Sequence, residues 1–223
     1  MGGNWWIEIV FLAMMAGFIA LRLVSVLGRR TGNESPATGE AYRGGTAELA
    51  PAQTTIEGRT RPAPVLPEGL PAEARDGLTA IAALDPAFDA ARFLEGARGA
   101  YGMILGAFWS GDLSEVEPFV SDEIGDQFKR AIAERAESGS TVDNRVVGID
   151  DARIIAAHLD GTMAEVVVRI DAAIAGVTRD AEGRVIGGSP SEAVHAKDEW
   201  TFRRHVSALD PNWLLVATEA HDD

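Results

Sequence analysis

The chain has 223 residues and a formal net charge of −14, from 20 Lys and Arg against 34 Asp and Glu. This acidic balance argues against nucleic acid as a partner and against electrostatic docking on an anionic bilayer. The absence of cysteine excludes a disulfide framework, a thiol nucleophile and a cysteine metal site.

Residues 1–30 are predicted to form a transmembrane anchor with a basic flank. The run from Ile7 to Leu27 is largely apolar and would span roughly 31 Å as a helix, which matches a hydrocarbon core. Basic residues follow this run, whereas a secretory signal has them in front, and tryptophans precede it where an interface belt belongs. The residues that carry this prediction are Trp5, Trp6, Arg22, Arg29 and Arg30. They favour an uncleaved single-pass anchor with a cytoplasmic C-terminal domain, against a buried core helix or a signal peptide.

Residues 31–84 are predicted to be a flexible linker. Pro, Gly, Ala and Thr dominate up to about Ala80, and large apolar residues are sparse and show no sustained period. Such a segment cannot bury enough surface to fold. The globular domain is therefore predicted to occupy residues 85–223, tethered near the membrane.

The first helix of this domain is predicted to start at Asp85-Pro86, an N-cap acid followed by a proline at the first helical position. Apolar residues then continue at helical spacing to Phe108. Four glycines interrupt this helix, and each costs about 1 kcal/mol relative to alanine at an exposed position. They predict close approach of another backbone in tight internal packing, or a groove for a ligand or partner. These glycines are Gly96, Gly99, Gly102 and Gly106.

Two more helices follow, and then the pattern changes to strands. A capping box from Asp112 to Glu115 predicts a short second helix, and Ser121 begins a third that Gly139 ends. The hydrophobic period then becomes 2, with a hairpin at Asp160-Gly161 and a long strand from about Ala193 to Val206. A last strand covers WLLVAT. The fold class is therefore α+β, with three helices packed on a four-stranded antiparallel sheet.

The long strand carries two charges on its apolar face. Asp198 and Arg204 share that face with Trp200 and Phe202, about 20 Å apart along the strand, so they cannot pair with each other. Each needs another partner or a wet pocket. For Asp198 we considered a structural ion pair, a sheet-edge position, or a general base in a cleft.

The sequence offers little for catalysis. The four histidines have no spacing typical of metal ligands, no serine lies in a G-x-S-x-G elbow, and no metal or cofactor is expected. Asp198, with a nearby His or Tyr, is the only weak catalytic candidate. The candidate pocket or core residues are Tyr101, Ile104, Phe108, Trp200, Phe202 and Trp213. They leave open an alternative function, a pocket that binds a small hydrophobic ligand or acts as an isomerase or dehydratase.

Three stretches carry a family resemblance: LRLVSVLGRRTGNE after the anchor, AYGMILGAFWSGDLSEVEPFVSDEIGDQFKRAIAER over the helices, and WTFRRHVSALDPNWLLVAT at the end. They resemble the Tim-forty-four-like domain family, the bacterial relatives of the mitochondrial inner-membrane import-motor scaffold. The resemblance implies a strongly curved, cone-like sheet similar to nuclear-transport-factor and cystatin-like folds. It also implies a non-enzymatic adaptor at the bacterial inner membrane, on the cytoplasmic side, with other proteins of a membrane complex as partners.

One part of the family pattern is different here. The mitochondrial scaffold recruits the import chaperone through a long N-terminal region, and a short linker behind an anchor takes that place in this chain. Chaperone recruitment therefore does not follow from the resemblance.

Overall fold

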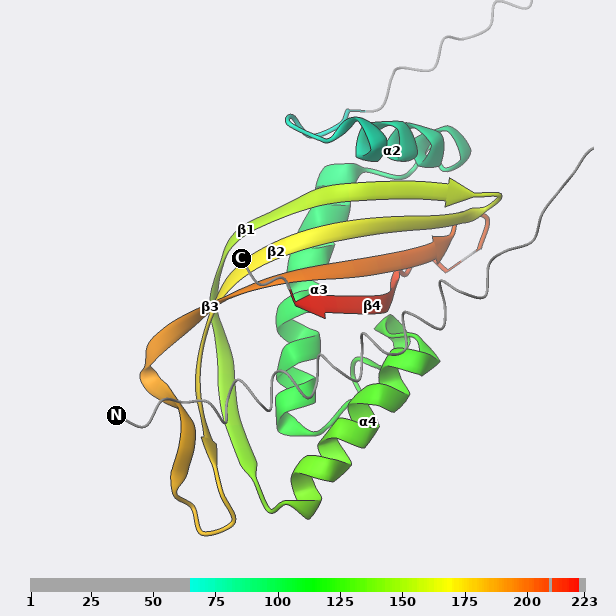
Figure 1. The fold of residues 1–223 in the computed structure, drawn as a ribbon. Coiled ribbons are helices and arrows are strands. Elements are labelled where there is room, and N and C mark those ends of the chain that lie inside the picture. Colours follow the sequence, from blue (N-terminus) through cyan, green and yellow to red (C-terminus); the bar gives the residue numbers. More distant parts are fainter. Residues whose placement is uncertain (1–64, 209, 221–223) are drawn as a thin grey trace, which may run out of the picture. The chain divides into compact units, whose positions relative to one another are not determined.

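The computed structural model describes residues 65–208 and 210–220. Within this range lie three α-helices, one 3-10 turn and a single antiparallel sheet of strand order β1-β2-β3-β4 (Figure 1). The elements are α2 Ala72–Leu84, α3 Ala90–Ser110, η1 Glu117–Phe119, α4 Asp122–Glu137, β1 Thr141–Asp160, β2 Met163–Arg179, β3 Val185–His205 and β4 Leu214–Ala220. The predicted α+β class is confirmed for this part of the chain.

The predicted anchor lies outside the described residues, together with Trp5, Trp6, Arg22, Arg29 and Arg30. Among the helices that the structure does describe, none combines the length and the apolar character needed to cross a membrane.

Helix α2 corrects the predicted linker. The prediction of a structureless segment up to residue 84 is wrong for Ala72–Leu84, which forms a helix that packs on β1. Ala74, Leu78 and Ile81 are fully buried in the main core. Their spacing of three or four residues is helical, but the stripe is short and follows a proline-rich stretch, so it is easily read as linker. The folded domain therefore begins before Asp85.

The start of α3 also differs from the prediction. The helix begins at Ala90, and Asp89 is its N-cap, because Asp89 Oδ1 accepts a hydrogen bond from Arg92 N at 2.9 Å. Asp85 instead follows α2, where its Oδ1 accepts from Ala87 N at 3.0 Å. The Asp-Pro pair thus makes the turn between two helices, and does not start the second one.

The predicted short second helix is reduced to the 3-10 turn η1, since Pro118 leaves too little chain for an α-helix. The third predicted helix is confirmed as α4. Ser121 caps it by accepting from Ile124 N at 3.3 Å, and Gly139 follows its end with a φ of 66°.

The sheet is more irregular than the sequence pattern suggests. The hairpin between β1 and β2 is confirmed, with Asp160 opposite Met163. β3 begins at Val185, well before the predicted Ala193. Four residues from Pro190 to Ala193 bulge out between two paired stretches of β3, and this interruption hides the first stretch from a period-2 search.

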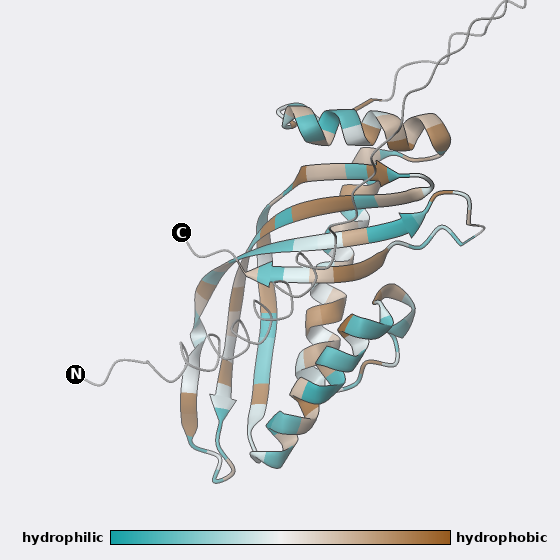
Figure 2. Cartoon of the chain, turned by 45° about the vertical axis from the view of Figure 1, so that its right-hand side comes forward, coloured by the Kyte–Doolittle hydropathy of each residue, from teal (hydrophilic) through white to brown (hydrophobic). Residues whose placement is uncertain are grey.

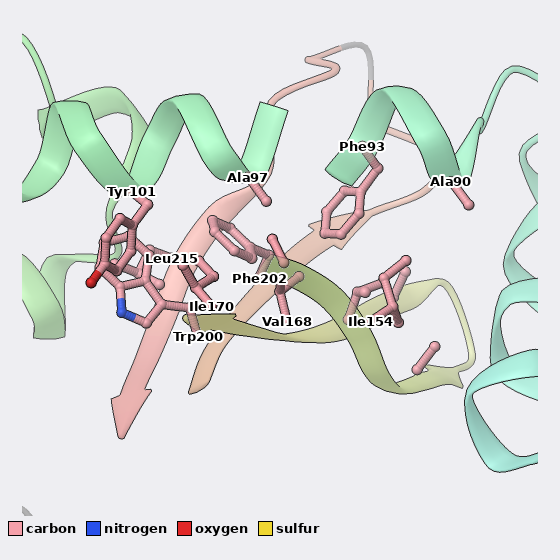
Figure 3. Close-up of a cluster of buried hydrophobic side chains, with 14 of the residues drawn as sticks. Ala90, Phe93, Ala97, Tyr101, Ile154, Val168, Ile170, Trp200, Phe202 and Leu215 are labelled. Carbon is pink, nitrogen blue, oxygen red and sulfur yellow. The ribbon is translucent and has the colours of Figure 1, made fainter. Parts of the chain in front are cut away.

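The core lies between α3 and the sheet. Phe93, Ala97 and Tyr101 point from α3 toward the strands, and Figure 3 shows them above Val168, Ile170, Trp200, Phe202 and Leu215. Alternate residues of β2 supply the floor, from Ala164 to Ala172. This alternation matches the period-2 pattern of a sheet with one buried face. The hydropathy colours of Figure 2 show apolar residues along β2 and a mostly hydrophilic α4.

The close backbone contacts are made by glycines other than the four in α3. A Cβ added at Gly77 would lie 2.0 Å from the carbonyl oxygen of Ala157, so α2 can pack this near β1 only without a side chain there. By contrast, a Cβ at any of the four α3 glycines would have no atom within 4 Å, apart from the helix's own turns and chain neighbours. The prediction that these glycines allow tight internal packing is therefore wrong.

Candidate functional site

Tyr101 and Asp198 form a polar pair inside the apolar core. The Tyr101 hydroxyl donates a hydrogen bond to Asp198 Oδ2 at 2.6 Å. Tyr101 is fully buried on the inner face of α3, and Asp198 is half-buried on β3 between Ile170 of β2 and Ala220 of β4. The helical period brings Tyr101 inward, and the strand period brings Asp198 to the same face as Trp200.

The Trp200 ring covers one side of this pair. The centroids of the Tyr101 and Trp200 rings are 4.8 Å apart, with the planes tilted by 49°. Figure 3 shows the two rings side by side beneath α3. Aromatic packing of this kind stabilises the position of the Tyr101 ring beside β3.

Burial dominates the electrostatics of the pair. It raises the pKa of the Asp198 carboxyl above its ordinary value, and the hydrogen bond from Tyr101 partly opposes this rise. Burial also raises the pKa of the Tyr101 phenol, and the negative charge and hydrogen bond of Asp198 add to that shift. The phenol therefore stays protonated and keeps its role as a donor.

The partner of Asp198 is thus a neutral hydroxyl. The predicted structural ion pair for Asp198 is wrong among the described residues, where its hydrogen-bond partner is Tyr101. The catalytic alternative for Asp198 needed a His or Tyr side chain close to the carboxylate. Tyr101 is such a side chain. Because burial raises its pKa, the Asp198 carboxyl is the member of the pair that could take up a proton, while the phenol stays protonated.

The second charge on this face, Arg204, finds a different partner. Its guanidinium pairs with Asp85, which lies just after α2, and both side chains are largely buried. The guanidinium also lies over the Trp213 ring, 5.2 Å from its centroid. Trp213 in turn packs against Phe93 of α3 at 4.8 Å. This cluster joins the α2–α3 turn to β3 and the approach to β4.

A groove lies apart from both clusters. It has a volume of about 510 Å³ and runs between the segment 67–71 and β1. Leu70, Leu94 and Ile154 give it an apolar wall, while Arg153 and Arg169 border it. Both arginines are paired, Arg153 with Asp151 and Arg169 through its Nε with Glu199 Oε1 at 3.0 Å. Neither guanidinium is therefore free to attract an anion into the groove.

The structure separates the six predicted pocket or core residues into two groups. Tyr101, Ile104, Trp200 and Phe202 are in the core, and Trp213 packs at its border. Phe108 lies at the other end of α3, where it contacts Phe128 of α4 at a centroid distance of 5.0 Å. None of the six lines the groove described above.

Two features of the site were missed in the sequence. The pairing of Arg204 with Asp85 joins residues 119 positions apart, and the helix-start pattern at Asp85 gave that residue another role. The second missed feature is helix α2, and the helical spacing of Ala74, Leu78 and Ile81 is the one sequence signal that pointed to it. No metal site is added by the structure, since no cluster of three or more His, Asp or Glu suited to a metal ion occurs in residues 65–208 and 210–220.

Helices on one face of an antiparallel sheet, with an aromatic core and one partly buried acid–phenol pair, define a small α+β domain. The model of the Tim44-like domain matches residues 74–220, from α2 to the end of β4. The chain therefore belongs to the Tim44-like domain family, as the resemblance in its sequence predicted.

One curated relative is the human protein named mitochondrial import inner membrane translocase subunit TIM44. It is 24% identical over 151 residues, which cover 66% of this chain and 33% of the human protein. The match thus spans about a third of that relative. Among solved structures, the intermembrane space region of the chloroplast protein ARC6 is similar over 60% of this chain and 98% of its own, with 17% identity and a TM-score of 0.40. That likeness is too low to support any conclusion about this chain.

Proposed function

We propose that this protein is a membrane-anchored, non-catalytic adaptor of a protein-translocation or protein-handling machinery. The observation that carries the proposal is the Tim44-like match from residue 74 to residue 220, which covers the described helices and strands except the first two residues of α2. The name of the human relative places that protein in an import translocase of an inner membrane. The domain that this chain shares with the human protein is the part that would carry the adaptor role.

The packing of Tyr101 and Asp198 supports a role without catalysis. A catalytic dyad must meet its substrate in an accessible cavity, with heavy atoms within hydrogen-bond reach. Here the phenol is fully buried under α3 and is engaged by the carboxylate, and neither residue lines the groove. The pair is therefore better placed to hold α3 on β3 than to act on a substrate.

The proposed location rests on residues 1–30. An apolar run followed by Arg29 and Arg30 favours an anchor in the bacterial inner membrane, with the Tim44-like domain in the cytoplasm. Partners would then be other proteins of a membrane complex. Nucleic acid does not suit a chain with a net charge of −14.

Crosslinking in intact membranes tests this function. Full-length protein with an affinity tag should be crosslinked in place, and the captured proteins identified by mass spectrometry against an untagged control. We expect subunits of a membrane-bound translocation or protein-quality machinery in stoichiometric amounts. If the tag recovers no such protein above the control, the adaptor function is wrong.

The groove beside β1 favours a second candidate, the binding of a small hydrophobic ligand. Its wall from Leu70, Leu94 and Ile154 is apolar, and its volume of about 510 Å³ falls within the range of ligand pockets. A lysine in place of Leu94 would put a charge on this wall. If the groove binds a ligand, this variant should lose a co-purified apolar compound that native mass spectrometry detects on the unmodified chain.

A further inference from the structure

β4 is an edge strand of the sheet that the structure describes. It is the last strand of the order β1-β2-β3-β4, and its partner β3 pairs with it only over residues 198–203. Within the described residues, a single bridge at Leu215 is the only pairing on its other side. Figure 1 shows β4 as the outermost strand of the sheet.

The two edges of the sheet differ in how they are protected. Edge strands expose unpaired backbone groups, and proteins usually blunt them with bulges, prolines or lysines. The pairing of β1 with β2 shifts register three times, between Val146 and Gly148, Ile149 and Asp151, and Ile154 and Ala156. β4 has the sequence LLVATEA, a strand of 7 residues with one charge, Glu219, and no proline or lysine. Its one register shift is near Leu215, so the stretch from Ala217 to Ala220 is regular.

The register shows which backbone groups of β4 face outward. Val206 N donates to Thr162 O on the β2 side, so even-numbered residues of β3 turn their N–H and C=O groups toward β2. Trp200 is one of these, and it lies opposite Thr218. Residues opposite each other in an antiparallel pair either both bond to each other or both point away. Thr218 therefore directs its N–H and C=O away from β3, and Ala220, opposite Asp198, does the same.

The protein's own chain already uses the beginning of this edge. Val120 forms a parallel bridge with Leu215, and Ser121 N donates to Leu215 O at 2.9 Å. The chain then turns into α4 at Asp122 and leaves the edge. Among the described residues, the chain pairs with the outer side of β4 only at its beginning, and the rest of that edge has the geometry to accept an extended backbone.

We propose that the outer edge of β4, from Val216 to Ala220, receives an extended segment of a partner protein as an added strand. Recognition of this kind depends on main-chain hydrogen bonds and tolerates many sequences, which suits an adaptor that handles other polypeptides. The exposed Asp122 and Glu123 follow Ser121 directly and therefore stand near the Leu215 end. They favour a basic partner segment. The inference rests on the adaptor function proposed above.

Two peptides test whether the β4 edge binds an added strand: a strand-forming peptide, and a version of it that lacks alternate backbone N–H donors. The probe is a short synthetic peptide in which valine alternates with lysine and threonine, titrated into the full-length protein in detergent micelles. We expect saturable binding and slower hydrogen exchange in the segment 214–220. N-methylation of alternate peptide amides removes backbone donors at unchanged charge, and should weaken binding about tenfold for each hydrogen bond lost.

A matched pair of variants places the binding on β4. Thr218→Pro removes an outward N–H that β3 does not use, whereas Thr218→Val keeps that N–H and alters only the side chain. Thr218→Pro should weaken peptide binding about tenfold, and Thr218→Val should leave it unchanged. Binding that survives both N-methylation and Thr218→Pro, or no binding at all, overturns the proposal. The protein could instead form dimers in a concentration-dependent way. If Thr218→Pro abolishes these dimers and the peptide does not dissociate them, the edge binds a second copy of this chain and not a partner segment.

The membrane crosslinking described above separates failure of the edge from failure of the adaptor function. If the unmodified protein and Thr218→Pro capture the same machinery in equal amounts, the edge proposal fails and the adaptor function stands. If the unmodified protein captures no machinery, the adaptor function fails whatever the peptide does. Loss of capture in Thr218→Pro, with Thr218→Val intact, supports both.

Discussion

The Tyr101 hydroxyl and the Asp198 carboxylate lie 97 residues apart in the sequence and are joined by a 2.6 Å hydrogen bond between α3 and β3. The bond connects the helix that covers the core to the strand at the centre of the sheet's aromatic cluster. Because burial raises the pKa of Asp198, the folded protein holds this carboxylate in an environment that disfavours its charge.

Replacing Asp198 tests what the pair contributes to stability. Asp198→Asn keeps an acceptor for the Tyr101 hydroxyl and removes a buried charge, so the free energy of unfolding should change by less than about 1 kcal/mol or rise. Asp198→Ala leaves the hydroxyl buried without an acceptor and should cost about 1–3 kcal/mol. Urea unfolding of both variants measures the difference. Equal losses in the two variants would show that a cation holds Asp198, contrary to the structure.

The raised pKa of Asp198 also sets the sign of a pH effect. The folded state binds this proton more tightly than the unfolded state, so its contribution to stability is full below the ordinary carboxyl pKa of 3.8 and declines as pH rises through the folded value. The free energy of unfolding of the unmodified protein should therefore fall relative to that of Asp198→Asn over this range, and then level off. A relative gain with rising pH would contradict the assignment.

Trp200 should be among the most important residues for folding. It is 2% exposed and contacts both Tyr101 and Phe202. Trp200→Ala should lower the free energy of unfolding by roughly 3–5 kcal/mol, the usual loss for a large core aromatic. Denaturant unfolding of the variant gives the value. A loss below about 1 kcal/mol would place this side chain outside the core.

Two glycine substitutions distinguish close packing from open space. Gly77→Ala would force a methyl group against the carbonyl oxygen of Ala157 and should destabilise the domain by about 1–3 kcal/mol. Gly99→Ala meets no neighbouring atom and should stabilise α3 by up to about 1 kcal/mol through helix propensity. Thermal unfolding of the two variants under the same conditions compares them. If Gly77→Ala is as stable as Gly99→Ala, α2 does not pack on β1 as described.

Membrane topology is tested by a reporter at the C-terminus. Because Arg22 lies near the end of the apolar run and Arg29 and Arg30 follow it, a phosphatase that is active only in the periplasm should stay inactive when fused after Asp223. A reporter that is active only in the cytoplasm, fused at the same position, serves as the control. High phosphatase activity would reverse the proposed orientation.

Local patterns in the sequence predicted β2, the turn before it and the last helix. The alternation in β2, the Asp160-Gly161 turn and the cap at Ser121 depend on neighbours within a few residues, and the structure has all three. The two faces of β3 were also predictable, since period 2 places Asp198 and Trp200 together. The bulge at Pro190–Ala193 concealed the first stretch of β3, because it breaks that period.

Contacts between distant residues could not be predicted in the same way. Nothing in the spacing of Tyr101 identifies it as the partner of Asp198, and Asp85 looked like a helix cap although it pairs with Arg204. Helix α2 was missed because the stripe of Ala74, Leu78 and Ile81 is short and follows a proline-rich stretch. Its stability comes from burial on β1, which only the tertiary fold supplies.

Quantitative crosslinking in intact membranes, with the unmodified protein beside Asp198→Asn, tests the central claim that the protein works by binding and not by catalysis. The substitution removes the proton chemistry of the pair while keeping the hydrogen bond from Tyr101. We predict that both proteins capture the same translocation or protein-handling subunits in equal amounts. Failure of the unmodified protein to capture any such subunit, or full capture by Asp198→Asn together with loss of a ligand-dependent activity, would contradict the account.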